Sequence, residues 1–303
     1  MPTLIDFRRR IRSVKNTQQI TRAMKFVAAA KLRRAQERAV AARPYVREMR
    51  RVLRSAMARI ENPKFPLLAH RPEERILVLV LTGNKGLCGA FNTNVVRRAL
   101  EFLREHAQQR VRVIPVGKKG RDALRKRRLD LAAEYVNLSA SVEFSQAREI
   151  ASRVIEMFSS GEVDAVYAVF NEFKSVLTQR LLVEKLLPIE PEQLGDDGWN
   201  EASGDRPARL AEERAVLNVD YIYEEPPEEI YAKLLPRYVE TQVFRVLLES
   251  AAAEQAARMT AMDSATNNAA ELIDQLTLYM NKVRQAAITR EIIEVVSGAV
   301  STD

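Results

Sequence analysis

Three glycines stand three residues apart in a short loop that follows an apolar run and precedes a helical pattern: Gly83, Gly86 and Gly89. This order of strand, glycine-rich loop and helix is typical of phosphate-binding loops. The details differ, because no Gly-Lys-Ser/Thr closes the loop and the spacing does not form Gly-x-Gly-x-x-Gly. Lys85 alone cannot replace either pattern. The sequence therefore predicts a tight turn, with Asn92 or Thr93 capping the next helix.

Other residue types that do chemistry are few and scattered. Cys88 is the only cysteine, which excludes an intramolecular disulfide, and a packed small side chain is the expected role. The two histidines, His70 and His106, have no metal-ligating neighbours in the sequence. Glu291 and Glu294 share a helical face without a histidine, so we expect salt bridges or an interface there. The residues alone therefore predict no catalytic, cofactor-binding or metal site.

The middle of the chain must position this loop, and it alternates between two patterns. Short apolar runs predict strands at 75–81, 111–117 and 163–170, with a further strand, at a sheet edge, within 176–189. Helical patterns lie between them at 93–107, 118–128 and 145–159. This alternation predicts an α/β fold with a mainly parallel sheet covered by helices.

The N-terminal stretch predicts one long helix. It has no glycine from Thr3 to about Ile60, and Pro44 is expected to kink or interrupt it. Apolar residues recur at a spacing of three or four, forming a narrow seam. Its members are Leu4, Phe7, Ile11 and Val14, then Ile20, Met24 and Val27, then Leu32, Ala35, Ala39, Ala42, Val46, Met49, Leu53 and Ala56. The seam is expected to shift phase near Thr17–Ile20, so a strict supercoil is not expected there.

The C-terminal stretch predicts a second long helix, from about Pro236 to Ser297, or about 90 Å. Its seam alternates steps of four and three through Ala269, Ile273, Leu276, Met280, Val283 and Ala287. A helix this long needs a partner helix, and the N-terminal one is the obvious candidate. We therefore predict an antiparallel coiled coil of the two ends, residues 1–60 and 226–303, around an inserted α/β domain, residues 61–225, whose stretch 195–215 is irregular.

Composition leaves two alternatives for function. The net charge is +8 and the isoelectric point is about 9.6, so contact with acidic surfaces is expected. An Arg-rich coiled coil could bind nucleic acid, although only Phe26 and Tyr45 could stack on bases within residues 8–59. An enzyme that uses a nucleotide is the other alternative, and substitution of Gly83 or Lys85 would test it. No stretch approaches a membrane span, and a soluble chain without a cleavable leader is expected.

Three stretches resemble a known family. They are NTQQITRAMKFVAAAKLRRAQ (16–36), GLCGAFN (86–92) and MNKVRQAAITREIIEVVSGAV (280–300). All are similar to the γ subunit of the F-type ATP synthase, and the similarity extends over essentially the whole chain. The resemblance implies an antiparallel coiled coil with an inserted Rossmann-like domain. It also implies that nucleotides bind the α and β subunits, so this chain would have no active site and no cofactor.

The implied role is that of the central rotor stalk. One copy would transmit rotation from the membrane c-ring to the α3β3 ring during ATP synthesis or hydrolysis, in a complex that translocates protons or sodium. The complex would lie at the cytoplasmic face of a bacterial cell membrane. By this resemblance the expected contacts with the ring are Arg8, Arg9, Arg12, Met24, Lys25, Arg284, Gln285, Thr289, Glu291 and Glu294. Tyr221, Tyr223 and Glu224 are expected at a foot that contacts the c-ring and the ε subunit.

Overall fold

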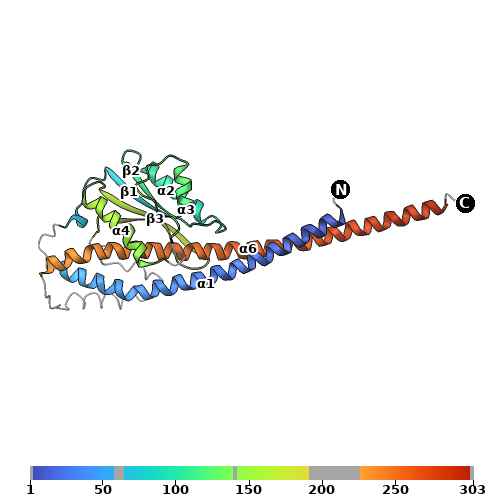
Figure 1. The fold of residues 1–303 in the computed structure, drawn as a ribbon, viewed down its shortest axis with the longest axis horizontal. Helices are drawn as coiled ribbons and strands as arrows, with labels where there is room; N and C mark the ends of the chain where they lie inside the picture. The colour runs from blue at the N-terminus through green and yellow to red at the C-terminus, as the bar shows by residue number, and fades with distance from the viewer. Residues whose placement is uncertain (1–2, 58–64, 139–141, 191–225, 301–303) are drawn as a thin grey trace. The chain divides into compact units, whose positions relative to one another are not determined.

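Two long helices dominate the computed structural model, which describes residues 3–57, 65–138, 142–190 and 226–300 (Figure 1). Helix α1 spans Leu4–Met57 and helix α6 spans Pro227–Val300. Pro44 lies inside α1, so of the predicted kink or interruption the interruption is wrong and the kink stays a prediction. Helix α6 begins nine residues before the predicted start at Pro236. Nothing in the described helices is apolar over a stretch sufficient to cross a membrane. The chain divides into two compact units, residues 30–257 and residues 1–29 with 258–303.

A four-stranded sheet forms the centre of the unit at 30–257. Its strands are β1 (Arg75–Leu81), β2 (Arg110–Val116), β3 (Ala165–Phe173) and β4 (Gln179–Leu187), in the order β2-β1-β3-β4. Strand β1 pairs in parallel with β2 and β3, whereas β4 pairs antiparallel with β3 at the edge. The predicted mainly parallel sheet with an edge strand is confirmed.

Helices cover both faces of this sheet (Figure 1). Alternate residues of β1, such as Leu77 and Leu79, pack with α4 (Phe144–Ser159) and with the first part of α6. The other set, such as Ile76 and Val78, packs with α2 (Phe91–Glu105) and α3 (Lys118–Arg125). A strand covered on both faces needs apolar residues at every position, which is why β1 appears in the sequence as an unbroken apolar run.

An ionic cluster joins the edge strand to α6. Arg245 is buried, with 8% of its side chain exposed, and forms an ion pair with Glu184 of β4. It also contacts Glu249 at 3.2 Å and donates a hydrogen bond to Gln242 at 2.9 Å. Three partners for one buried guanidinium satisfy most of its donors, as a buried charge requires.

In the other unit, the first part of α1 packs along α6, with contacts that run from Lys25–Asp263 to Phe7–Tyr279. The predicted seam on α6 is confirmed, because Ala269 is buried and its other five members are half-buried, whereas neighbours such as Leu272 and Leu278 are exposed. The predicted phase shift on α1 is wrong. Ile20 and Val27 are 60% and 56% exposed, and the heptad spacing that starts at Leu4 continues without a break.

The inward positions of α1 keep their heptad spacing, but the residues at them change from apolar to mostly polar. After Leu4, Phe7, Ile11 and Val14, the next inward positions at steps of four and three are Gln18, Thr21, Lys25 and Ala28. Three of these four are polar, so a search for apolar spacing selects the wrong face of the helix. Near the start of α1, the ring of Phe7 packs against the ring of Tyr279 of α6, with their centroids 5.2 Å apart.

Candidate interaction surface

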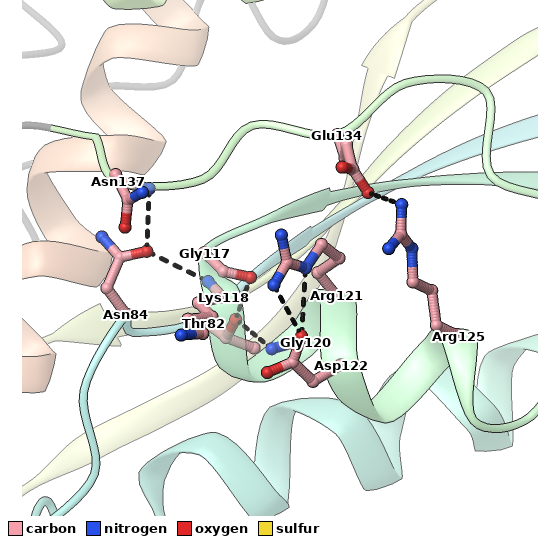
Figure 2. Close-up of polar contacts among 10 residues, drawn as sticks. All are labelled: Thr82, Asn84, Gly117, Lys118, Gly120, Arg121, Asp122, Arg125, Glu134 and Asn137. Carbon is pink, nitrogen blue, oxygen red and sulfur yellow. Dashed lines mark hydrogen bonds and ion pairs between the residues drawn. The ribbon is translucent and has the colours of Figure 1, made fainter.

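The glycine-rich loop leads from β1 to α2 and meets the start of α3 (Figure 2). The Thr82 hydroxyl accepts a hydrogen bond from the Gly120 amide at 2.8 Å, and the Gly83 carbonyl accepts one from the Lys119 backbone amide at 3.1 Å. Asn84 Oδ1 accepts one from the Lys118 amide at 3.0 Å. Amides at a helix N-terminus are what a phosphate would bind. In α3 the first three amides are already bonded to oxygens of the protein.

Glycines in this region allow the elements to approach one another closely. Gly117 has φ +104°, and a Cβ there would lie 2.0 Å from the Thr82 carbonyl oxygen. At Gly83 a Cβ would lie 2.8 Å from the carboxylate of Glu254 in α6. The glycines therefore serve the packing of β1, α3 and α6, which is the close-approach role of glycine.

The start of α2 corrects one prediction. The helix begins at Phe91, its N-cap is Ala90, and no side chain makes a capping hydrogen bond, so the predicted cap at Asn92 or Thr93 is wrong. Asn92 instead accepts a hydrogen bond from the Gly83 amide at 2.8 Å and donates one to Cys88 Sγ at 3.1 Å. Asn92 therefore stabilises the glycine-rich loop and does not cap the helix.

Cys88 itself is packed, as the sequence predicts. Its side chain is 1% exposed and lies among Phe91 and Ala253, with Phe173 and Ala257 at the margin. A buried thiol in apolar surroundings is chemically inert compared with one that is exposed and near cations. Cys88 therefore acts as a small packed side chain whose sulfur also accepts the hydrogen bond from Asn92.

A polar cluster at Tyr167 shows displaced pKa values without a pattern typical of catalysis. The Tyr167 hydroxyl donates to Glu73 at 2.8 Å, and the Lys185 ammonium lies 2.9 Å from the same carboxylate. Burial raises the pKa of Tyr167, and the hydrogen bond to Glu73 raises it further. Burial alone would raise the pKa of Glu73, but hydrogen bonds from Lys185 and Tyr167 lower it below its ordinary value. The groups hold one another in their ordinary charge states.

The predicted ring contacts on α1 differ in their surroundings. Arg8, Arg9 and Arg12 are exposed, and Met24 is half-buried. Lys25 points to the partner helix, where its ammonium lies 2.5 Å from Asp263 Oδ1. The structure therefore places four of these five side chains at least partly on the outer surface and engages the fifth within the helix pair.

The predicted contacts on α6 lie near its C-terminal end. Arg284, Gln285, Thr289 and Glu291 are exposed, and the Thr289 hydroxyl donates to the Gln285 carbonyl at 2.9 Å. The Glu294 side chain lies outside the described residues, as do Tyr221, Tyr223 and Glu224.

Large apolar side chains also face outward on the same unit, which the sequence reasoning did not assign to this surface. They include Ile20, Phe26 and Val27 on α1, and Ile288, Ile292 and Ile293 on α6. A strict heptad count from Leu4 would have placed Ile20 and Val27 on the outer face.

Comparison with known proteins gives a consistent result. The ATP synthase family profile matches residues 3–301. The chain is 53% identical to an ATP synthase gamma chain of Solibacter usitatus, with full coverage of both sequences. It is 47% identical to one of Chloroherpeton thalassium over 99% of this chain and 98% of the relative.

Solved structures agree. The central stalk and c-ring structure of the Tetrahymena thermophila mitochondrial ATP synthase includes a chain with a TM-score of 0.57 and 27% identity, over 81% of this chain and 99% of that one. A chain in the OSCP/F1/c-ring structure of the Euglena gracilis enzyme gives a TM-score of 0.65 over 99% and 94%. At 21% identity, that likeness concerns the fold alone.

Proposed function

Because this chain belongs to the ATP synthase gamma chain family, we propose that the outer surface of its helix pair transmits rotation to a surrounding ring of α and β subunits. The chain is a central-stalk subunit of the rotary complex, whose catalytic sites are on the β subunits. It supports ATP synthesis and ion transport at the level of the whole complex. What it contributes is therefore a shaped surface rather than a reacting group.

The observation that carries the proposal is the composition of the outer surface in residues 4–29 and 258–293. Arginines such as Arg8 and Arg12 stand on the same unit as outward-facing Ile20, Ile288 and Ile292. Several large apolar side chains exposed on one unit are compatible with a surface that a partner covers. Cations add attraction that acts over several ångströms and does not require one fixed geometry.

Asymmetry provides the mechanism. The two helices present different side chains around the stalk, so each β subunit would meet a different surface at any moment. A contact that is stronger in one state of a β subunit shifts its population towards that state. Turning the stalk moves each contact to the next subunit, and the preferred state moves with it.

The residues proposed to make these contacts are Arg8, Arg9, Arg12, Met24, Arg284, Gln285, Thr289, Glu291 and Glu294. We keep Lys25 in the same region, although its ammonium is engaged with Asp263. Tyr221, Tyr223 and Glu224 remain a proposal for a foot that contacts the c-ring and ε. We also propose that each complex contains one copy of this chain and lies at the cytoplasmic face of a bacterial membrane.

Co-expression with α and β subunits from the same genome tests this function. Gel filtration should recover a complex that contains one copy of this chain, and its ATPase activity should depend on that copy. A well-folded chain that does not co-purify would contradict the proposal. Tight, salt-sensitive DNA binding by such a chain would then favour the nucleic-acid alternative.

A further inference from the structure

Between Gln18 and Ala28, three of the four inward positions of α1 are polar, and large apolar side chains face outward. Thr21 is 8% exposed and Lys25 is half-buried, whereas Ile20 and Val27 are more than half exposed. Burial of apolar surface is the main force that orients a helix on its partner. This segment opposes that force, so something specific must hold it.

Two contacts across the helix pair occupy the inner face. The hydroxyls of Thr21 and Thr266 lie 2.8 Å apart. Thr266 also lies 2.7 Å from the Met262 carbonyl, and Thr21 lies 3.0 Å from the Gln18 carbonyl. Each hydroxyl has one hydrogen, so one threonine donates to its own helix and the other donates across to it. The contact therefore adds one hydrogen bond across the pair to the one that a threonine hydroxyl makes within its own helix.

The second contact lies one helical turn further along α1. The Lys25 ammonium and Asp263 Oδ1 are 2.5 Å apart, with side chains 36% and 47% exposed. A partly exposed ion pair adds little to stability by itself. In paired helices, however, such pairs decide orientation and register, and a polar group at a seam position does the same.

A competing arrangement is close at hand. Ile20, Met24 and Val27 each precede one inner residue, Thr21, Lys25 and Ala28, by one position. Rotating α1 by one residue, about 100°, would turn that apolar set towards α6 and expose the polar set, but it would also turn Phe7 and Val14 off the seam. We propose that Thr21–Thr266 and Lys25–Asp263 form a polar latch, which helps to fix the rotation of α1 so that Ile20 and Val27 face away from α6.

The latch also opposes axial slippage of the helices. A shift of α6 by one heptad would place Ile273 or Met259 where Thr266 stands, and Ala270 or Ala256 where Asp263 stands. Neither replacement could pair with a hydroxyl or an ammonium. Small residues dominate α6 near this point, so packing alone distinguishes the registers poorly. The latch concerns the helix pair itself and does not depend on the proposed role in a ring.

Thiol accessibility in the full-length chain tests the latch. The parent carries Cys88→Ser, and single reporter cysteines are placed at Val27→Cys, outside, and at Ala28→Cys, inside. Asp263→Lys sets a second cation against Lys25. We expect it to slow maleimide labelling at position 27 and to speed labelling at position 28, each by about threefold or more. Adding Lys25→Asp restores the opposite charges and should return both rates to those of the parent.

A matched control uses the ion pair between Arg33 and Glu37 of α1, which are 2.9 Å apart and exposed. Glu37→Lys makes the same charge change away from the latch and should alter neither rate. Unchanged rates in a folded Asp263→Lys chain would overturn the proposal, and so would an equal effect of Glu37→Lys. If circular dichroism shows that Asp263→Lys is unfolded, Asp263→Ala is labelled instead, and unchanged rates in that variant overturn the proposal.

Discussion

Arg245 of α6 and Glu184 of β4 form an ion pair that attaches the edge of the sheet to the longest helix of the protein. Among the described residues, the antiparallel edge strand has β3 alone as a strand neighbour, so its other contacts there come from outside the sheet. The same guanidinium holds Glu249, one turn along α6. The sheet is thereby joined to α6 by charge as well as by apolar packing.

Removing this guanidinium should be costly. Arg245→Met leaves the carboxylates of Glu184 and Glu249 without their cation, and we expect the free energy of unfolding to fall by about 3 kcal/mol. Arg148→Met is the control, because Arg148 is half-exposed and 3.7 Å from Glu240, so its loss should cost at most about 1 kcal/mol. Urea denaturation of both variants measures the difference. Equal losses would show that the burial of Arg245 does not matter.

Asp164 provides a pH-dependent contribution to stability. Hydrogen bonds from Arg75 hold the pKa of Asp164 below its ordinary value, with contacts at 2.7, 2.9 and 3.0 Å. A lowered folded pKa means that the contribution is fully present above the unfolded pKa, about 4, and is lost as the pH falls through the folded pKa. Asp164→Asn should therefore cost about 1–2 kcal/mol at pH 7 and progressively less below pH 4. Urea denaturation at pH 7, 5 and 3 tests this, and a penalty independent of pH would contradict it.

Gly117 should tolerate no side chain. In Gly117→Ala the new Cβ would meet the Thr82 carbonyl oxygen at 2.0 Å, in a backbone conformation with φ +104°, so we expect a loss of about 3 kcal/mol or more. Gly86→Ala is the matched control in the same region, because the nearest atom to its Cβ would be Lys119 Cε at 3.9 Å. That variant should change stability by no more than about 0.5 kcal/mol. Thermal unfolding distinguishes the two.

Truncation after Lys282 should separate folding from function. It removes Arg284, Gln285, Thr289 and Glu291, which are exposed and lie outside the unit that contains the sheet. We expect weaker assembly with α and β subunits and less ion pumping per ATP hydrolysed, with the α/β unit still folded by circular dichroism. Full coupling in the truncated complex would disprove the contact role of these residues. Arg290→Ala, an exposed position outside the proposed set, serves as a control for non-specific loss of charge.

The sequence predicts the sheet well because each strand has a strong local signature. Strand β1 matches its prediction at both ends, since a strand buried on both faces is apolar at every position. The seam at 18–28 could not be found in the same way. Apolar spacing selects Ile20, Met24 and Val27, whereas the inward face is decided by partners on a helix more than two hundred residues away.

Asn92 shows the same limit on a smaller scale. Its type and its position near a helix start favour a cap, but Gly83 offers it an amide that local sequence does not reveal. The proposed contacts with the ring stay predictions for a different reason, because they depend on the surfaces of other subunits. The exposure of Arg8 or Arg284 is compatible with such contacts without identifying the partner.

The first three backbone amides of α3 are already hydrogen-bonded within the protein, which bears on how the stalk responds to nucleotides around it. A gamma chain works beside subunits that bind and release nucleotides continually. Thr82, Gly83 and Asn84 already accept the hydrogen bonds of the first three amides, so a phosphate arriving at this junction would have to displace bonds that hold β1 and α3 together. If nucleotide bound here and changed the packing, the shape of the stalk would depend on the ATP concentration as well as on its rotation. We therefore expect the packing of β1 against α3 to stay the same as the local ATP concentration changes.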